Sequence, residues 1–314
     1  MILKLRLGLV ITLLLCTATT AYSDGFDSGK AAFSIKVDNS LQIPYREFAL
    51  YVNQGDGIII TSSVDILLQA EQGTSQAVAG GWHWTAPMKT GLYPVEVRSS
   101  GLGKISLNVF VIRPATEIKK GRLGHYIIGQ YAARPYRDLP VYQAPTGFVE
   151  VQKEFTGLKI SPHFTLGQFL CKQDSGWPKY LVLRPELVIK LENILEKLNR
   201  EGISTDTLEI MSGYRTPWYN QTIGNRTTSS RHLYGGAADI YIDVKPRDGR
   251  MDDLNKDGKI NRSDAAYLYD LLEEWSTAGW WKYFSGGLAV YGSTPAHGPF
   301  VHVDARGYRA RWGH

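Results

Sequence analysis

The sequence predicts two domains, an all-β, immunoglobulin-like sandwich followed by an α+β domain. The length of 314 residues suits about two domains of ordinary size. Short strand-like runs separated by turn residues fill residues 33–112, and a helical pattern follows only after them. Hydrophobic residues make up 43% of the chain and charged residues 21%, a balance that excludes a disordered, collagen-like or multi-span membrane protein.

The formal net charge of the chain is +5 at pH 7. This charge is too small to indicate a nucleic-acid-binding protein, so we expect no nucleic-acid partner. A mildly basic protein is nevertheless suited to an anionic polymer, and the bacterial cell wall is one such polymer.

Residues 1–23 have the pattern of a secretory signal peptide. Two basic residues precede an apolar run at 7–15, and small residues follow as far as Ser23. The run is too short for a comfortable membrane span. We therefore expect cleavage near Ser23, no stable membrane span in the mature form, and a periplasmic or secreted protein. The alternative is a lipoprotein attached through Cys16, although the leucine before it is bulky for that motif.

Cleavage of the signal would leave Cys171 as the single cysteine. The mature protein would then have no internal disulfide although it is exported. A reactive thiol needs a nearby base and an activating environment. No such pairing is visible around Cys171, so we interpret it as a buried or incidental thiol and not as a nucleophile.

Residues 24–115 are assigned to the β-sandwich. Strands are expected at 48–52, 57–61, 66–69, 92–97 and 105–111. Their spacing of roughly ten residues is typical of such folds. Trp82, Trp84 and Tyr93 are expected to form an aromatic core, with carbohydrate binding as the alternative use. Because no metal or nucleophile pattern occurs here, we interpret this region as an accessory module.

Residues 116–146 are rich in Gly, Tyr and Pro and are interpreted as a linker or connecting segment, which leaves 147–314 for the second domain. A helix is expected to begin around Pro185, because proline is favoured in the first turn of a helix, and to end at Gly202. Its apolar residues recur at helical spacing: Leu187, Leu191, Ile194, Leu195 and Leu198.

Two short stretches hold three residues of metal-ligand type. His232 and Asp239 lie in the first, and His302 lies in the second. Zinc in a hydrolase takes three ligands of this kind and leaves a fourth position to water. Small residues between His232 and Asp239 let the backbone turn so that the two side chains converge. Strand alternation places His302 and Asp304 on one face, where they can serve as ligand and proton carrier.

The order of these motifs resembles that of the zinc D-Ala-D-Ala peptidases, a superfamily that includes hedgehog-type domains. The chain has Ser-Gly-Tyr-Arg at 212–215, Ser-x-His-x-x-Gly-x-Ala-x-Asp at 230–239, and Gly-Gly-x-x-x-Tyr at 286–291 before His-x-Asp at 302–304. The nearest similarity is to the murein endopeptidases of the K type, whose last motif is also His-x-Asp. The resemblance covers about residues 147–313.

The resemblance implies a zinc peptidase acting on peptidoglycan. His232, Asp239 and His302 match the zinc ligands. Arg215 matches an arginine that holds substrate or developing negative charge, a role that suits a guanidinium. Ser230 matches a residue at the substrate-binding edge. The implied reaction is hydrolysis of stem peptides or cross-links by a D,D- or L,D-endopeptidase or carboxypeptidase, and the accessory module favours an endopeptidase because it suits a polymeric substrate.

The catalytic base departs from the family pattern. Many members carry an acid or histidine three residues before the last ligand, and this chain has Pro299 there. Asp304 is therefore our first choice for the base that takes a proton from water, and His297 is the second. If neither reaches the water, the domain would bind peptidoglycan without cutting it, which is the alternative function.

Residues 253–264 match the 12-residue calcium loop, with Gly258 at its sharp turn. Oxygen ligands are expected from Asp253, Asn255, Asp257, Asn261 and Asp264 and from the backbone carbonyl of Lys259. The final Asp resembles that of dockerin repeats, but a single loop is present. The sequence therefore predicts one structural calcium in an EF-hand-like or dockerin-like insertion at about 244–283, followed by a helix.

Overall fold

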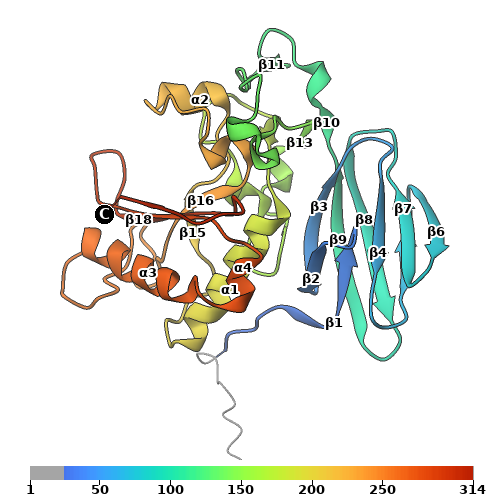
Figure 1. Ribbon diagram of the computed structural model, residues 1–314, viewed down its shortest axis with the longest axis horizontal. Coiled ribbons are helices and arrows are strands. Elements are labelled where there is room, and N and C mark those ends of the chain that lie inside the picture. The colour runs from blue at the N-terminus through green and yellow to red at the C-terminus, as the bar shows by residue number, and fades with distance from the viewer. Residues whose placement is uncertain (1–24, 314) are drawn as a thin grey trace, which may run out of the picture.

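The computed structural model describes residues 25–313, and the predicted signal peptide lies outside them. The described chain forms two parts (Figure 1): layered strands from the first third of the chain, and a mixed part in which a sheet is accompanied by helices. Within the described residues, no helix is both long enough and apolar enough to cross a membrane.

Two sheets that face one another make up the first part (Figure 1). One has the strand order β2-β1-β4-β7-β6, and the other has the order β3-β9-β8-β5. The first sheet comprises β1 (Lys30–Val37), β2 (Leu41–Tyr45), β4 (Gly57–Thr61), β6 (Thr74–Val78) and β7 (Gly81–Thr85). The second comprises β3 (Glu47–Val52), β5 (Leu67–Ala70), β8 (Gly91–Ser99) and β9 (Gly103–Val111). All neighbours are antiparallel except β3 and β9, which are parallel.

The core of this part is aromatic and aliphatic, in agreement with the sequence. Trp84 is fully buried and its indole N–H donates to the carbonyl of Gln72 at 3.0 Å. Tyr93 is also buried. Trp82 packs against the core but is only partly buried. The all-β character of the region is confirmed, whereas the immunoglobulin-like type of its fold stays a prediction.

The connecting segment is packed against the second part. It follows β10 (Arg113–Pro114) and η1 (Ala115–Glu117), and it contains β11 (Arg122–Leu123), β12 (Tyr126–Ile127) and the short 3₁₀ helices η2 (Tyr136–Asp138) and η3 (Pro140–Tyr142). The hydroxyls of Tyr131 and Tyr214 lie 2.8 Å apart. The amide of Trp218 donates to the carbonyl of Ile128 at 3.1 Å. These contacts hold the segment along the side of the site described below.

The second part is built on a five-stranded sheet with the order β15-β16-β18-β17-β19. Its strands are β15 (Glu209–Ser212), β16 (Ala237–Tyr241), β17 (Gly287–Tyr291), β18 (Phe300–Asp304) and β19 (Ala310–Trp312). In a small separate sheet, β13 (Gly147–Val151) pairs with β10 on one side and with β14 (Lys179–Leu181) on the other. The helices are α1 (Pro185–Arg200), α2 (Pro217–Thr222), α3 (Arg262–Trp275) and α4 (Gly279–Lys282), with η4 (Lys153–Phe155), η5 (Leu166–Phe169) and η6 (Arg231–Tyr234).

Helix α1 forms where the sequence predicts it, and Pro185 stands at its first position. The apolar residues that predict the helix are all fully buried: Leu187, Leu191, Ile194, Leu195 and Leu198. Gly202 follows with a φ of 81°, a left-handed conformation that suits glycine after a helix end. In Figure 1, α1 and α3 lie below the five-stranded sheet. Helix α3 packs against β17 and β18, and α1 reaches β18 through Lys190, whose Nζ donates to the carbonyl of Asp304 at 2.7 Å.

The two parts of the chain are joined by hydrogen bonds and ion pairs. The amide of Ala49 in β3 donates to the carbonyl of Ile160 at 2.8 Å. Lys30 Nζ lies 2.6 Å from Glu196 Oε2 on α1. His163 Nδ1 lies 2.7 Å from Glu192 Oε2, and its Nε2 lies 2.9 Å from the carbonyl of Asp27. The accessory part therefore contacts the second half of α1 and the segment around residues 160–163.

Candidate metal centre

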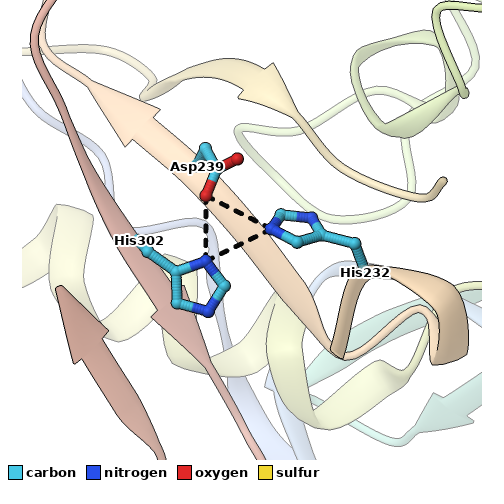
Figure 2. A group of neighbouring side chains, drawn as sticks. All are labelled: His232, Asp239 and His302. Atoms are coloured by element: carbon cyan, nitrogen blue, oxygen red, sulfur yellow. Dashed lines mark hydrogen bonds and ion pairs between the residues drawn. The ribbon is translucent and has the colours of Figure 1, made fainter. Parts of the chain in front are cut away.

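Antiparallel pairing of β16 with β18 places Asp239 directly opposite His302. Their side chains point to the same face of the sheet, because residues directly opposite each other in an antiparallel pair share a face. His232 comes from η6, the short helix that precedes β16, and its ring points at the same spot (Figure 2). Three residues from three elements therefore converge at one point.

The turn between η6 and β16 explains why the intervening residues are small. Gly235 ends η6 with a φ of 65°, in the left-handed region that favours glycine. A Cβ at this position would also overlap the carbonyl of Val182. The chain can thus reverse direction within a few residues and carry both His232 and Asp239 into the site, as the sequence predicts.

The three potential ligand atoms form a tight triangle (Figure 2). His302 Nδ1 lies 2.9 Å from Asp239 Oδ1, His232 Nε2 lies 3.2 Å from the same oxygen, and the two nitrogens lie 3.2 Å apart. Within residues 25–313, this is the one group of three or more such side chains whose ligand atoms all lie within 4.8 Å of one another. All three residues are buried. Two imidazole nitrogens and a carboxylate oxygen form a donor set that fits zinc with one position left open.

The ring of His232 is held in the tautomer that a metal ligand needs. Its Nδ1 lies 2.7 Å from the carbonyl oxygen of Gly213. Because a carbonyl oxygen only accepts, Nδ1 carries the proton and Nε2 presents its lone pair to the triangle. Burial, aided by the charge of Arg215, lowers the pKa of His232 to about 4. The ring is therefore neutral at pH 7.

The other two members of the triangle, Asp239 and His302, share a hydrogen bond, and each ring nitrogen of His302 faces a carboxylate oxygen. Burial opposes ionisation of Asp239, but the neighbouring His232, His302 and Arg215 outweigh it and hold the pKa of this carboxyl well below its usual range. Burial likewise opposes protonation of His302, whereas hydrogen bonds to Asp239 and Asp304 outweigh it and raise the pKa of the imidazole. A metal ion at this point would replace that proton, since ligand imidazoles bind in the neutral form.

Arg215 anchors the ligand carboxylate. Its Nη2 lies 2.5 Å from Asp239 Oδ2, the oxygen that faces away from the two imidazoles, and its Nε donates to Ser212 Oγ at 2.7 Å. The side chain also lines the cavity over the triangle. Arg215 therefore lines the cavity with its bonds directed to Ser212 and to a predicted ligand, and its role toward substrate stays a prediction.

Asp304 lies on the side of His302 away from the triangle. Its Oδ2 is 3.1 Å from His302 Nε2, whereas Asp239 contacts Nδ1 of the same ring. Arg306 Nε lies 2.9 Å from each carboxylate oxygen of Asp304, and the amide of Gly287 donates to Oδ1 at 2.8 Å. The carboxylate is fully buried and saturated with donors. This geometry does not fit the predicted role of Asp304 as the base that takes a proton from water; it fits a positioning role on His302.

Two glycines make room for Asp304. A Cβ on Gly286 would overlap the carbonyl of Asp304, and a Cβ on Gly287 would overlap its carboxylate and the ring of Trp312. The Gly-Gly of the 286–291 motif is therefore required by the close approach of β17 to Asp304. This pair of glycines is the sequence signal that could have placed Asp304 inside the sheet and not at the open cavity.

An open cavity of about 740 Å³ lies over the triangle. His297 and Ser230 line it together with the three potential ligands and Arg215. His297 is partly buried, and its Nδ1 lies 2.8 Å from the carbonyl of Gly298. Its proton therefore sits on Nδ1, and Nε2 is left as an acceptor. Of the two predicted bases, His297 is the one that lies in the cavity with an acceptor atom.

Several residues of the site were not anticipated from the sequence. Lys172 lines the cavity, and the charges of Asp239 and Arg215 both act on its ammonium group. Lys190 of α1 is fully buried behind the site, where Nζ donates to the carbonyl of Asp304 at 2.7 Å and lies 4.0 Å from the ring centroid of Trp281. Cys171 is buried, and burial raises the pKa of its thiol, which agrees with its interpretation as inert.

The predicted calcium loop is a compact turn that leads into α3. Asp253 accepts hydrogen bonds from the amides of Asp257 and Gly258, at 3.1 and 2.8 Å. Asp264 is fully buried, accepts from Leu254 at 2.9 Å, and forms a capping box with Asn261 at the start of α3. The predicted helix after the loop is present. The carboxylates of the loop are bonded to amides of the same loop, and the structure leaves calcium binding as a prediction.

Comparison with known proteins agrees with this site. The Peptidase M15 family matches residues 162–256, less than a third of the chain. The matched range includes His232, Asp239 and Arg215 but ends before His302. No curated protein matches the chain. The match supports the resemblance to the zinc D-Ala-D-Ala peptidases and indicates a hydrolase of the metallopeptidase class; the similarity to the K type in particular stays a prediction.

Proposed function

We propose that this chain is an exported zinc peptidase that hydrolyses peptide bonds in the stem peptides or cross-links of peptidoglycan. The observation that carries the proposal is the buried triangle of His232, Asp239 and His302 at the base of an open cavity of about 740 Å³. The family match over residues 162–256 supports the same reaction class. Export rests on the predicted signal peptide at 1–23.

The residues present fit zinc, and each potential ligand is held by a partner outside the triangle. Gly213 holds His232, Arg215 holds Asp239, and Asp304 holds His302. Such outer partners fix the orientation of the donor atoms and are typical of metal sites in enzymes. Bound zinc supplies Lewis acidity, which polarises a carbonyl and makes water a better nucleophile near neutral pH.

The side chains of the cavity supply the remaining chemistry. His297 Nε2 accepts the proton of the attacking water and returns it to the leaving amine. Arg215 lines the cavity and holds Asp239 in place, and its positive charge beside the reacting centre favours the negative charge that develops on the carbonyl oxygen without a direct bond to it. Asp304 keeps the ring of His302 in place and takes no part in proton transfer to the substrate.

The alternative function is a non-catalytic protein that binds peptidoglycan through the same fold. The proline at position 299, where many relatives carry a base, favours it. The intact donor set and the presence of His297 in the cavity favour the enzyme, because a binding protein has no need of an open metal position. We prefer an endopeptidase to a carboxypeptidase because the accessory part suits a polymeric substrate.

Digestion of purified peptidoglycan tests the proposal, with the products identified by mass spectrometry. Loss of cross-linked dimers that is abolished by a chelator and restored by zinc would establish an endopeptidase. Release of terminal alanine alone would indicate a carboxypeptidase. An unchanged substrate, with protein shown to contain zinc, would contradict the proposal and favour the binding protein.

We also propose that residues 253–264 bind one structural calcium ion. The oxygen-bearing residues stand at the positions that a 12-residue calcium loop requires, and Gly258 has a φ of 82° at the sharp turn. The helix that follows, α3, packs against β17 and β18. Calcium would therefore stabilise the layer that supports His302.

A further inference from the structure

The cavity over the triangle continues into a second hollow of about 200 Å³. Four residues line both spaces: Lys172, Met211, Ala296 and His297. The second hollow extends past them to Tyr241 and Arg250. A peptide that lay across both spaces would therefore pass His297, with chain on either side of it.

The cleft formed by these two spaces is lined by more cations than anions. Asp239 is the one carboxylate among its lining residues, and five lining residues carry permanent or near-permanent positive charge: Lys172, Arg215, Arg231, Arg250 and Arg306. A predicted metal ion would add to this positive charge. The balance favours a substrate with negative groups.

Three of the five cations are already engaged. Arg215 is paired with Asp239, and Arg306 is paired with Asp304. Arg231 is 1% exposed. Its Nη1 donates to the carbonyl of Val141, and its guanidinium carbon lies 5.0 and 5.6 Å from the ring centroids of Tyr142 and Tyr234, which hold it in the wall of the cleft.

The other two cations, Lys172 and Arg250, are free to bind a ligand. Both side chains are exposed, and neither forms an ion pair within residues 25–313. Partial burial lowers the pKa of Lys172, while the charges of Asp239 and Arg215 act on it in opposite directions. Lys172 lines both the cavity over the triangle and the second hollow, so it lies where the two spaces meet.

We propose that the second hollow is a subsite for a free carboxylate of the substrate, bound by Lys172 and Arg250, on peptide that extends beyond the bond being cut. The inference rests on the proposed peptidase function and makes it more specific. A subsite with two free cations favours substrates with a carboxylate at the matching position, so we expect a preference for acidic stem peptides over their amidated forms.

Paired synthetic cross-linked peptides test this subsite. The two members of each pair differ only in carrying a carboxylate or a carboxamide at one position, and hydrolysis by the zinc-loaded protein gives KM and kcat. At the position that reaches the second hollow, we expect the carboxylate peptide to have a KM about tenfold lower than the carboxamide peptide. The two peptides should have similar kcat values. The preference should weaken as salt is added, because the charges are exposed.

Variants assign the preference to the named residues. Lys172→Met and Arg250→Gln should each reduce the preference for the carboxylate peptide, and Lys172→Glu should reverse it. Lys153→Met removes an exposed lysine elsewhere in the same part of the chain and should leave the preference unchanged. Equal KM values for the two peptides with the wild-type protein would overturn the proposal, and so would an unchanged preference in Lys172→Met.

Calorimetry separates failure of the subsite from failure of the peptidase function. The probe is the same peptide pair with a non-hydrolysable isostere in place of the scissile amide. Tighter binding of the acid form, lost in Lys172→Met, would support the subsite even if no peptide were cut. Cleavage of both forms with equal binding would overturn the subsite and leave the peptidase function in place.

Discussion

The side chains of His302 and Asp304 are hydrogen bonded, with 3.1 Å between Nε2 and Oδ2, on the opposite side of the imidazole from Asp239. The two residues alternate on one strand, so the sequence places them on one face but does not say which ring nitrogen each carboxylate meets. In the structure, one carboxylate lies with the potential ligands and the other lies behind the ring. Asp304 thus orients the ring of His302, one of the three potential ligands.

Asp304→Asn should weaken zinc binding by about 10–100-fold, the usual effect of removing a partner that orients a ligand. At saturating zinc, most of the kcat should return, because the residue takes no proton from water. A zinc-competition assay with a chromogenic chelator measures the first quantity and steady-state kinetics measures the second. Normal zinc affinity combined with a large loss of kcat would show instead that Asp304 is the base.

His297→Gln should lower kcat by about 10²–10⁴-fold, the range typical of losing a general base. Zinc stoichiometry should stay that of the wild type, since the residue is outside the triangle. The matched control is His125→Gln, which changes an exposed histidine of the connecting segment. Wild-type kcat in His297→Gln would exclude this residue as the base.

Arg215→Lys should lower kcat/KM by about 10–100-fold although the charge is kept. A lysine cannot bond Ser212 and Asp239 with one planar fork, so Asp239 would lose its fixed orientation. Arg215→Ala should be worse, because Asp239 would then also lose its charge partner. Measurements of kcat/KM and zinc affinity on both variants test whether Ala is worse than Lys at this position. An Arg215→Lys variant with the kcat/KM of the wild type would mean that charge alone matters.

Lys190 predicts a dependence of stability on pH. Burial lowers its pKa to about 7 from an ordinary value near 10.5. The unfolded chain therefore binds more protons than the folded one between these values, and the free energy of unfolding rises with pH across that window. The destabilisation is absent above about pH 10.5, grows as pH falls across the window, and is complete below about pH 7.

Lys190→Met should remove this dependence. Compared with wild type, the variant should therefore gain more free energy of unfolding at pH 6 than at pH 9. Denaturant unfolding at several pH values measures the difference. Lys197→Met, on the same helix, is the control, because its ammonium is partly exposed and paired with Glu201. Identical pH profiles for wild type and Lys190→Met would contradict the assigned pKa.

Calcium should raise the unfolding temperature of the wild-type protein, and EGTA should reverse the rise. Calcium at about 100 times its dissociation constant corresponds to about 2.7 kcal/mol of stabilisation. Asp253→Asn should lose most of the response, whereas Asp270→Asn, an exposed aspartate on α3 outside the loop, should keep it. A wild-type protein whose unfolding is unaffected by calcium would refute the site.

Much of the local structure could be predicted because its causes are local. Pro185 and the spacing of the apolar residues after it are sufficient to predict α1. Turn residues at regular intervals are sufficient to predict most strands of the first part. The identity of the three potential ligands could also be predicted, since a short glycine-containing turn joins two of them and strand alternation presents the third.

The unexpected features depend on segments far apart in the sequence. Lys172 precedes Asp239 by 67 positions, and nothing near it indicates that its ammonium faces the cavity. The sequence alone determined the helix α1 and the calcium-loop pattern, because each is encoded in neighbouring residues, and it identified the donor set through two short motifs. Only the tertiary structure decided that Asp304 is buried behind His302 while His297 faces the cavity, because burial and ring orientation follow from the packing of β17, β18 and α1 around them.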